Sequence, residues 1–283
     1  MISGLVSVMM PAYNAERFIA EAIESVLAQS YEQWELLVVN DGSKDRTAVI
    51  TARYDDPRIR LINKENGGEA TARNRAIKES RGEFIAYLDS DDAWLPHHLQ
   101  VTVAYLQAHP EREAVYTDGY HYTPEGKRTK PLSARRRGPF EGDIFAQVVR
   151  ASDVFGPPIC VVLRHELVAQ HQLRYDTRIV IGPDWDFFTR YSELATFGYL
   201  DDKTCLYRVH QTNITVQVDR KRRAGYLALC REKATQLARF DELPVWVRTA
   251  VYDDLLVYLT IGQPQRQNQL VQTAQFAALP ADK

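Results

Sequence analysis

The amino-acid sequence predicts an α/β protein with a mostly parallel, twisted sheet, helices on both faces of that sheet, and a C-terminal helical extension. Two observations lead to this fold class. Apolar runs of strand length recur through the first half of the chain, and segments with helical periodicity separate them. Each run also ends abruptly in polar or turn-forming residues. Strands that are buried on both faces of a parallel sheet and joined by helices have this pattern.

Four apolar runs in the first half are predicted to be strands, at residues 5–10, 34–39, 58–62 and 84–88. Helices are predicted between and after them, at residues 18–27, 47–54, 70–80 and 96–109. The first helix has the clearest signal, because its apolar residues fall on one stripe. Pro96 suits the first turn of the fourth helix. We expect His97 and His98, which follow it, to lie on the surface.

The alternation of strands and helices ends after Glu113. Residues 114–117, 159–163 and 204–209 are predicted to be strands, and residues 184–194 a helix. From residue 219 onward the pattern is helical, with a basic start at residues 220–223. We therefore expect one α/β domain over residues 1–215, divided into halves at 1–112 and 113–215, and a helical extension over residues 216–283.

The composition argues against several classes of protein. The chain has 35 Lys and Arg against 37 Asp and Glu, a net charge of −2, so no global field favours nucleic acid or a membrane. No window approaches 18 consecutive apolar residues, so no transmembrane helix is predicted. The three cysteines are an odd number without a C-x-x-C pair. They argue against a disulfide framework and favour buried thiols in a cytoplasmic protein.

Three predicted strands end in polar segments: Pro-Ala-Tyr-Asn at 11–14, Asn-Asp-Gly-Ser at 40–43 and Asp-Ser-Asp-Asp at 89–92. Ligands of open α/β sheets bind beyond the carboxyl ends of the strands. We therefore expect Asp41 and Asp89 to converge on one crevice, where ionised carboxylates accept hydrogen bonds from a nucleoside. Asn-Asp-Gly is also ordinary turn sequence, so a surface turn is the alternative for Asp41.

The segment at residues 89–92 places three carboxylates in four residues, which repel one another unless a cation or solvent offsets them. Directly after a strand, such a cluster suits Mg²⁺ or Mn²⁺, which takes one or two carboxylates and completes its shell with substrate phosphates. The alternative is an acidic helix N-terminus, where Asp interacts favourably with the helix dipole.

These segments occur in a definite order and together resemble the family 2 glycosyltransferases of the GT-A fold. The opening block comprises residues 6–14 and 34–43, the next block residues 66–74, and the D-x-D block residues 84–92. Gly-Pro-Asp-Trp-Asp at 182–186 resembles the acceptor-side motif and Tyr-Arg-Val-His at 207–210 the closing motif. The likeness covers about residues 5–215. It implies that the half at 1–112 binds a nucleotide-sugar and the half at 113–215 binds the acceptor.

The resemblance also implies roles for individual residues on the donor side. The base and ribose of the nucleotide-sugar are held by residues near the first two strand ends, namely Pro11, Ala12, Tyr13 and Asp41. Asn66 and Arg73 lie near the base or the diphosphate, and the guanidinium fork of Arg73 can pair with phosphate oxygens. Asp89, with Ser90 beside it, meets the ribose. Asp91 ligates a Mn²⁺ or Mg²⁺ ion that bridges the diphosphate, and His210 approaches the same metal or the diphosphate.

Asp184 corresponds to the general base of the family. Inverting transfer needs a carboxylate that takes the acceptor hydroxyl proton as the oxygen attacks the anomeric carbon. The family usually has Glu before this Asp, whereas this chain has Pro183, and Asp186 is the alternative base. Trp185 either stacks on an acceptor sugar or fills the core.

The implied function is metal-dependent, inverting transfer of a sugar from a nucleotide-diphospho-sugar, most simply a UDP-sugar. The acceptor is a glycan, lipid-linked or polymer hydroxyl, in cell-surface polysaccharide synthesis, and the location is cytoplasmic or the inner face of the membrane. Six basic residues at 127–137 form either a solvated loop or a grip on an anionic acceptor. The basic cluster at 220–223 can contact an anionic membrane surface, as a peripheral association.

Three other classes compete with this interpretation. A haloacid-dehalogenase-like phosphatase also has D-x-D after a strand, but its pattern expects Thr or Val where this chain has Asp92 and Ala93. A nucleotidyltransferase needs a glycine-rich phosphate loop, and residues 11–14 contain no glycine. A non-catalytic sugar-binding relative is disfavoured by the joint presence of Asp91, Asp184 and His210.

Overall fold

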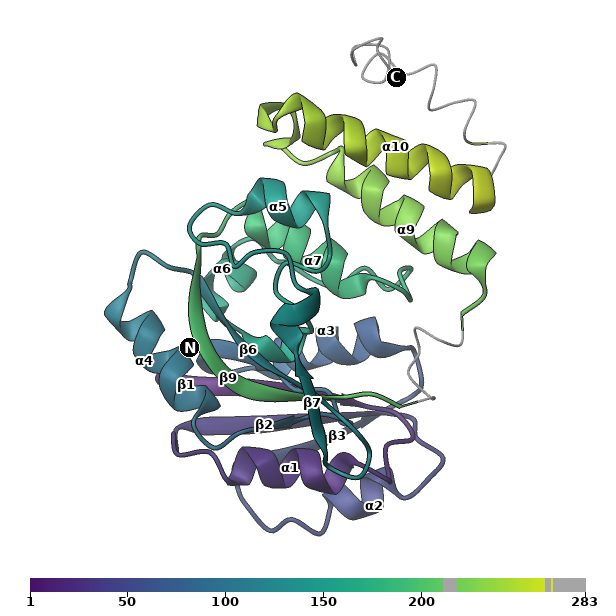
Figure 1. Ribbon diagram of the computed structural model, residues 1–283. Helices are drawn as coiled ribbons and strands as arrows, with labels where there is room; N and C mark the ends of the chain where they lie inside the picture. Colours follow the sequence, from purple (N-terminus) through teal and green to yellow (C-terminus); the bar gives the residue numbers. More distant parts are fainter. Residues whose placement is uncertain (211–217, 263–265, 267–283) are drawn as a thin grey trace.

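The protein is described by a computed structural model that places residues 1–210, 218–262 and 266 (Figure 1). Its centre is a nine-stranded sheet with the strand order β3-β2-β1-β4-β8-β6-β9-β5, and β7 pairs with β6. The strands are β1 (Ile2–Ala12), β2 (Trp34–Asp41), β3 (Ile59–Lys64), β4 (Gly82–Tyr87), β5 (Ala93–Trp94), β6 (Ala114–Tyr122), β7 (Arg128–Pro131), β8 (Val161–Arg164) and β9 (Phe197–Arg208).

The first four strands of the sheet are parallel, as the sequence predicts. β1 lies between β2 and β4, and β3 flanks β2. Alternate residues of β1 enter two different cores, since Val8 and Met10 pack on one face and Met9 on the other. All three side chains are fully buried. Burial on both faces explains why this strand is an unbroken apolar run.

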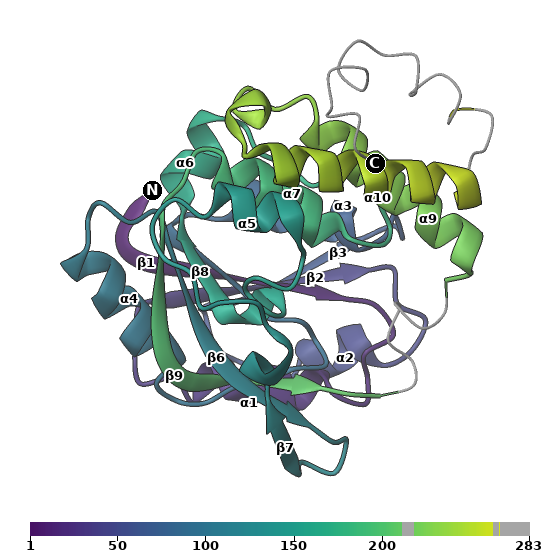
Figure 2. The ribbon, with the colours of Figure 1, turned by 45° about the horizontal axis from the view of Figure 1, so that its top comes forward.

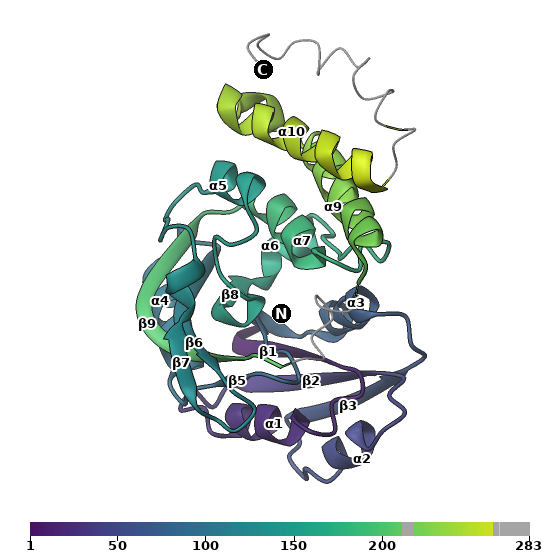
Figure 3. The same cartoon turned by 45° about the vertical axis from the view of Figure 1, so that its right-hand side comes forward.

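Helices cover both faces of the sheet (Figure 3). One face packs against α1 (Ile19–Leu27), α2 (Thr47–Thr51) and α4 (His98–Ala108). The other face packs against α3 (Glu69–Glu79), α5 (Phe145–Arg150), α6 (His165–Gln170) and α7 (Pro183–Ser192). The carboxyl ends of β1, β2 and β4 therefore face one edge, beside the starts of α1, α2 and α3.

The second half of the sheet is mixed rather than mostly parallel. β8 runs antiparallel to both β4 and β6, and β5 runs antiparallel to β9. β7 is antiparallel to β6, and this hairpin projects from the body of the molecule (Figure 2), whereas β6 and β9 are parallel. The direction of β8 depends on a long connection from β6, and local periodicity carries no information about such pairings.

The C-terminal part of the structure is helical, as predicted for the described residues. α9 (Arg220–Ala234) and α10 (Val245–Gly262) pack on each other, and α9 also packs on α7 (Figure 1). A separate apolar cluster joins α10 to α5 through Val247, Val251, Phe145 and Val149. The expected domain boundary at residue 215 lies outside the described residues and stays a prediction.

Three smaller expectations have clear outcomes. Cys160, Cys205 and Cys230 are buried free thiols in the structure, as the sequence indicates. The surface placement of His98 is wrong, because its ring is fully buried, stacks on Trp94 and forms a 2.7 Å hydrogen bond with a threonine hydroxyl. Among the helices placed in the structure, we find none with the length and hydropathy that crossing a bilayer requires.

Candidate functional site

Asp41 ends β2 inside a cage of donors rather than in a surface turn. Its side chain is 4% exposed and pairs with the ammonium of Lys64. Its two oxygens also accept the backbone N–H groups of Gly67 and Gly68 at 3.0 and 2.8 Å. Gly68 has φ +86°, a left-handed conformation that suits glycine. The turn alternative for Asp41 is therefore wrong, and the carboxylate anchors the loop that opens α3.

The remaining predicted residues at the ends of β1 and β2 lie in the segments next to Asp41. Pro11 and Ala12 end β1, and Ala12 is 3% exposed, whereas Tyr13 is 52% exposed. The side-chain amide of Asn66 donates to the backbone oxygen of Asp41 at 2.9 Å. Asn14 joins the two segments, because its N–H donates to the hydroxyl of Ser43 at 3.0 Å. The ends of β1 and β2 are thus held side by side.

Arg73 stands at the centre of an acidic cluster. It lies on the first turns of α3, and its side chain is 1% exposed. Its guanidinium donates to Glu69 at 2.7–2.9 Å and to Asp89, just after β4, at 2.9 Å. A third carboxylate, Asp184 at the start of α7, lies 3.6 Å from Nη1. One arginine therefore joins the end of β4 to the helix that carries the expected base.

Several buried polar atoms around Arg73 form no hydrogen bond of ordinary geometry within the described chain. They are Nη1 of Arg73, Oδ1 of Asp184 and the hydroxyls of Tyr87 and Tyr175. The guanidinium also lies over both tyrosine rings, at 5.7 and 5.5 Å. Unsatisfied buried polar atoms are rare in native proteins, and each asks for an explanation. Two of the four, Nη1 of Arg73 and Oδ1 of Asp184, face each other at 3.6 Å, so polar atoms of a ligand or water can bind beside this ion pair.

Burial raises the pKa of two carboxyl groups in this cluster. Burial raises the pKa of Asp184 to about 6, although Arg73 opposes the shift and Glu69 adds to it. Burial raises the pKa of Asp89 to about 7, again against the effect of Arg73. Burial alone would lower the pKa of Arg73, but Asp184, Asp89 and Glu69 outweigh it and raise that pKa above its ordinary value. Asp184 keeps 29% exposure, so its carboxylate can be reached without opening of the core.

The segment after β4 meets the end of β9. Oδ2 of Asp91 lies 2.8 Å from Nε2 of His210. Arg208 is buried and donates its backbone N–H to Asp92 and its Nε–H to the backbone oxygen of Asp91, both at 2.7 Å. It also bonds Glu21 and the hydroxyl of Tyr122. The closing motif predicted from sequence is therefore brought onto the D-x-D segment, while Ser90 beneath it is 9% exposed.

The donor set at Asp91 fits a divalent cation only in part. The carboxylate of Asp91 and the imidazole of His210 face each other, and both are suitable ligands for Mn²⁺. A buried oxygen of Asp92 in the same segment has no hydrogen-bond partner among the residues described. Over the placed part of the chain, no group of three or more His, Cys, Asp or Glu side chains could hold a metal. Two protein ligands are compatible with an ion that takes its other ligands from phosphate and water.

Two of the other candidates near Asp184 have structural roles. Asp186 is 2% exposed and is paired with Arg190 at 2.6 Å and Lys233 at 3.0 Å. Trp185 donates its indole N–H to the backbone oxygen of Val148 at 2.7 Å, with Arg231 over its ring. Trp185 is therefore half-buried and held by contacts with α5 and α9. The geometry favours Asp184 over Asp186 as the free carboxylate.

The departure at Pro183 does not disturb the start of α7. Gly182 precedes it with φ +82°, and Pro183 occupies the first turn, where its missing N–H is not needed.

The basic run at 127–137 is more than a solvated loop, because Arg136 is 2% exposed, lies 3.8 Å from Asp118 and donates to the backbone of Thr117. The other five basic residues of this run are exposed.

The sequence did not indicate several residues that build this site. Lys64, Glu69, Tyr87, Tyr175 and Arg208 all contact a predicted site residue. The acidic residue four positions before Arg73 was a readable signal, since residues at that spacing face each other on a helix. Nothing local marks Tyr175, because it reaches Arg73 only through the fold.

Comparison with known proteins places the chain in a family. A sequence profile described as "Glycosyl transferase family 2" matches residues 7–171, more than half of the chain. The chain belongs to glycosyl transferase family 2. The resemblance expected from the ordered motifs is thereby confirmed, together with the enzyme class and the α/β fold that go with it.

Among curated relatives, the chain is similar to WfgD of Escherichia coli, a "UDP-Glc:alpha-D-GlcNAc-diphosphoundecaprenol beta-1,3-glucosyltransferase". The two are 47% identical over 103 residues, which cover 36% of this chain and 41% of WfgD. The chain spans between about a third and two thirds of the length of the first curated relatives it matches.

Two solved structures show the same fold. TarS 1–349 of S. aureus, in complex with UDP-GlcNAc, has a TM-score of 0.67 at 17% identity, over 96% of this chain and 78% of that one. The mannosyltransferase PcManGT of Pyrobaculum calidifontis, in complex with GDP-Man and Mn²⁺, has a TM-score of 0.59 at 20% identity. That match covers 98% of this chain and 81% of PcManGT.

Proposed function

We propose that this chain transfers a sugar, with inversion, from a nucleotide-diphospho-sugar to a hydroxyl of a lipid-linked or glycan acceptor in cell-surface polysaccharide synthesis. The observation that carries the proposal is the contact of Arg73 with both Asp89 and Asp184. It joins the carboxyl end of the parallel sheet, where donors of α/β proteins bind, to a carboxylate that can act as a base.

On the donor side, Asp41 holds the loop at 66–68 so that Asn66 and the ends of β1 and β2 surround one place. We propose that Pro11, Ala12 and Tyr13 contact the base and ribose of the donor, and that Asp89, with Ser90 beside it, contacts the ribose. We propose a UDP-sugar as the donor, and TarS, which was solved with UDP-GlcNAc, supports this choice. A GDP-sugar is the alternative, because PcManGT was solved with GDP-Man.

In the proposed reaction, Asp184 is the proton acceptor. The acceptor hydroxyl oxygen forms a bond to the anomeric carbon while the bond from that carbon to the diphosphate oxygen breaks, and nucleoside diphosphate leaves. The hydroxyl proton passes to Asp184. Arg73 is a positioning residue in this scheme, since it fixes the carboxylate of Asp184 from the buried side. The expected contact of Arg73 with the diphosphate remains a prediction.

Asp91 and His210 would hold the divalent ion, Mn²⁺ or Mg²⁺. When bound, the ion offsets the negative charge that develops on the leaving diphosphate. Arg208 orients this pair through its bonds to the 91–92 segment. Support for a metal comes from PcManGT, which was solved with Mn²⁺.

WfgD, whose name specifies a diphosphoundecaprenol-linked acceptor, supports a lipid-linked acceptor for this chain. We accordingly propose that the enzyme works in the cytoplasm at the inner face of the membrane. The exposed cations at residues 220–223, on the first turns of α9, are suited to a peripheral contact with anionic lipid.

Asp184→Asn tests the base assignment. We expect kcat to fall by about a thousandfold or more, because general-base catalysis and correct positioning are lost together. The dissociation constant for the UDP-sugar, measured by calorimetry, should change little. Asp201→Asn, at an aspartate whose side chain is 80% exposed on β9, is the matched control and should keep full activity. Near-normal turnover in Asp184→Asn would overturn the assignment.

Asp91→Ala tests the metal assignment independently. Donor binding should weaken, and its dependence on Mn²⁺ should be lost in the same variant. A phosphatase assay on p-nitrophenyl phosphate distinguishes a glycosyltransferase from a haloacid-dehalogenase-like phosphatase, because a glycosyltransferase should release no phosphate from this compound. Donor binding without any transfer or donor hydrolysis by the wild type would instead indicate a non-catalytic sugar-binding protein.

A further inference from the structure

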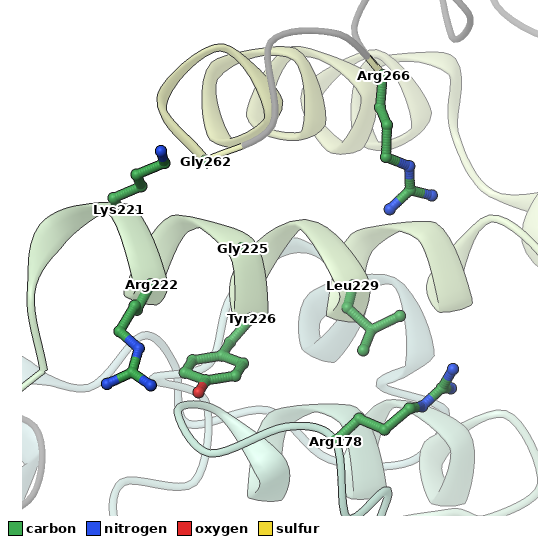
Figure 4. A pocket seen from close by; sticks show the side chains of 8 residues that line it. All are labelled: Arg178, Lys221, Arg222, Gly225, Tyr226, Leu229, Gly262 and Arg266. Carbon is green, nitrogen blue, oxygen red and sulfur yellow. The ribbon is translucent and has the colours of Figure 1, made fainter.

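The helical extension carries a pocket of about 470 Å³ that the proposed reaction does not use (Figure 4). It lies where α9 meets α10 and the loop before α7. Arg178, Lys221, Arg222 and Arg266 line it together with Tyr226, and none of the lining residues described is acidic. Figure 4 shows Arg222 and Tyr226 pointing toward the loop that carries Arg178, while Arg266 points from above toward α9.

Two glycines line this pocket where α9 and α10 cross. Gly225 on α9 and Gly262 on α10 both line it. A Cβ atom built on Gly262 would lie 3.0 Å from the backbone nitrogen of Gly225, so the helices approach as closely as glycine allows. A glycine inside a helix costs about 1 kcal/mol relative to alanine. Gly225 lies inside α9 and carries this cost, so the close crossing is kept at some expense in stability, and the cations line the pocket beside it.

The positive charge at this pocket is not explained by folding. Residues 220–223 are four basic residues at the start of α9, whose first turn has no acidic residue, although the N-cap Asp219 accepts the backbone N–H of Arg222 at 3.0 Å. Cations at a helix N-terminus interact unfavourably with the helix dipole. Arg178 is paired with Asp176 and Arg266 with Glu232, but Lys221 and Arg222 form no ion pair within the part of the chain that is placed. A bound anion would relieve this arrangement.

The pocket is close to the proposed base. Only residues 179–183 lie between Arg178 and Asp184, so their Cα atoms are within about 20 Å of each other. α9 also touches the loop directly, since a Cβ on Gly182 would lie 3.5 Å from the side chain of Leu227, the neighbour of Tyr226. Lys233 fixes the two together through Asp176 at 2.8 Å and Asp186 at 3.0 Å. A phosphorylated acceptor at Asp184 can therefore extend toward α9.

We propose that this pocket binds the diphosphate of the acceptor, with Lys221 and Arg222 as its principal ligands. The inference rests on the proposed function, because it assigns the diphosphate to the substrate that offers its hydroxyl to Asp184. Arg222 presents a fork that suits two phosphate oxygens, and Lys221, which points toward Gly262, adds a point charge at the α10 side of the pocket. The ligand class is an alkyl diphosphate, and an anionic lipid headgroup is the other source of the same phosphate chemistry.

A binding experiment tests the pocket without requiring glycosyl transfer. The probe is farnesyl diphosphate, titrated by calorimetry into the full chain in metal-free buffer, with farnesol as the uncharged control. We expect the double variant Lys221→Gln/Arg222→Gln to bind the probe at least about tenfold more weakly, since each charge-assisted contact to phosphate contributes on that order. Asp91→Ala should bind it as the wild type does, which separates this pocket from the donor site.

The matched control removes two positive charges elsewhere. Arg53→Gln/Lys78→Gln alters exposed residues of the donor half and should leave probe binding unchanged. In transfer assays the pocket variant should raise KM for a diphosphate-linked acceptor and leave kcat at saturation unchanged. Thermal melting confirms that each variant folds.

Equal affinity of wild type and pocket variant for farnesyl diphosphate, or no binding by either, would overturn the proposal. The proposal would also be overturned if phosphatidylglycerol vesicles displaced the probe from the wild type and not from the variant. The pocket would then bind anionic lipid headgroups in general. Calorimetry with UDP-GlcNAc on the same proteins reports separately on the proposed function. A chain that binds the donor normally but fails these tests loses only the pocket assignment.

Discussion

Arg73 shows how one residue sets the properties of this site. Its guanidinium is almost fully buried and faces Glu69, Asp89 and Asp184. Three carboxylates around one cation leave an excess of negative charge, and burial makes that excess expensive. The result is a carboxyl group on Asp184 whose pKa is raised to about 6, yet held lower than burial alone would make it. Arg73 therefore keeps the proposed base ionised at neutral pH.

This balance predicts the pH dependence of catalysis. A base must be deprotonated, so activity is present above the pKa of Asp184 and is lost as the pH falls through about 6. Arg73→Gln removes the charge that lowers this pKa, so the acidic limb of kcat/KM should move to higher pH. Arg73→Lys, which keeps the charge, is the control and should move the limb less. Profiles of kcat/KM between pH 5 and 8 make the comparison, and an unmoved limb in Arg73→Gln would contradict the role given to Arg73.

At the scale of elements, the D-x-D segment is held by β9 rather than by its own strand. Arg208, the last residue of β9, binds Asp91 and Asp92 and is itself fixed by Glu21 on α1 and Tyr122 on β6. Its guanidinium also lies over the ring of Phe18 at 4.5 Å. Three elements distant in sequence thus determine where Asp91 meets His210.

Arg208→Ala should accordingly weaken the proposed metal site without touching its ligands. Removal of residues that orient metal ligands typically lowers metal affinity or activity by about 10- to 100-fold. We expect the Mn²⁺ concentration for half-maximal activity to rise in that range. Arg128→Ala on exposed β7 is the control and should show the wild-type Mn²⁺ dependence. An unchanged Mn²⁺ requirement in Arg208→Ala would show that β9 does not position the site.

At the scale of the whole molecule, the buried side chain of Arg231 fastens the helical extension to the α/β domain. Arg231 on α9 is 3% exposed and pairs with Asp254 on α10. Its guanidinium also donates to backbone oxygens at the end of α5 and lies over Trp185 on α7. One arginine therefore connects four helices, including the helix that bears Asp184.

Asp254→Ala should destabilise this junction. Breaking a buried pair leaves an uncompensated charge and typically costs 3–5 kcal/mol. Asp254 is 31% exposed, so we expect a smaller loss of about 2 kcal/mol in the free energy of unfolding, measured with urea. Asp241→Ala is the control on the same extension. It breaks a surface pair whose aspartate is 78% exposed and should cost less than about 1 kcal/mol. Equal losses would indicate that Arg231 does not rely on Asp254.

The sequence by itself determined the parallel half of the sheet, its helices and the polar strand ends, because each depends on local periodicity. Strands buried on both faces must be continuous apolar runs, and amphipathic helices must carry a stripe, so β1, β2, β4 and α1 are readable residue by residue. The ordered motifs likewise gave Asp91 and Asp184 as candidates before any geometry was known.

Only the tertiary structure decided which of these residues meet. The burial of Arg73 against Tyr175, the hold of Arg208 on Asp91, and the structural roles of Trp185 and Asp186 all join segments far apart in the chain. The same is true of the antiparallel insertion of β8. Contacts of this kind depend on how layers pack and on which charges burial forces together. No spacing along a single segment encodes them.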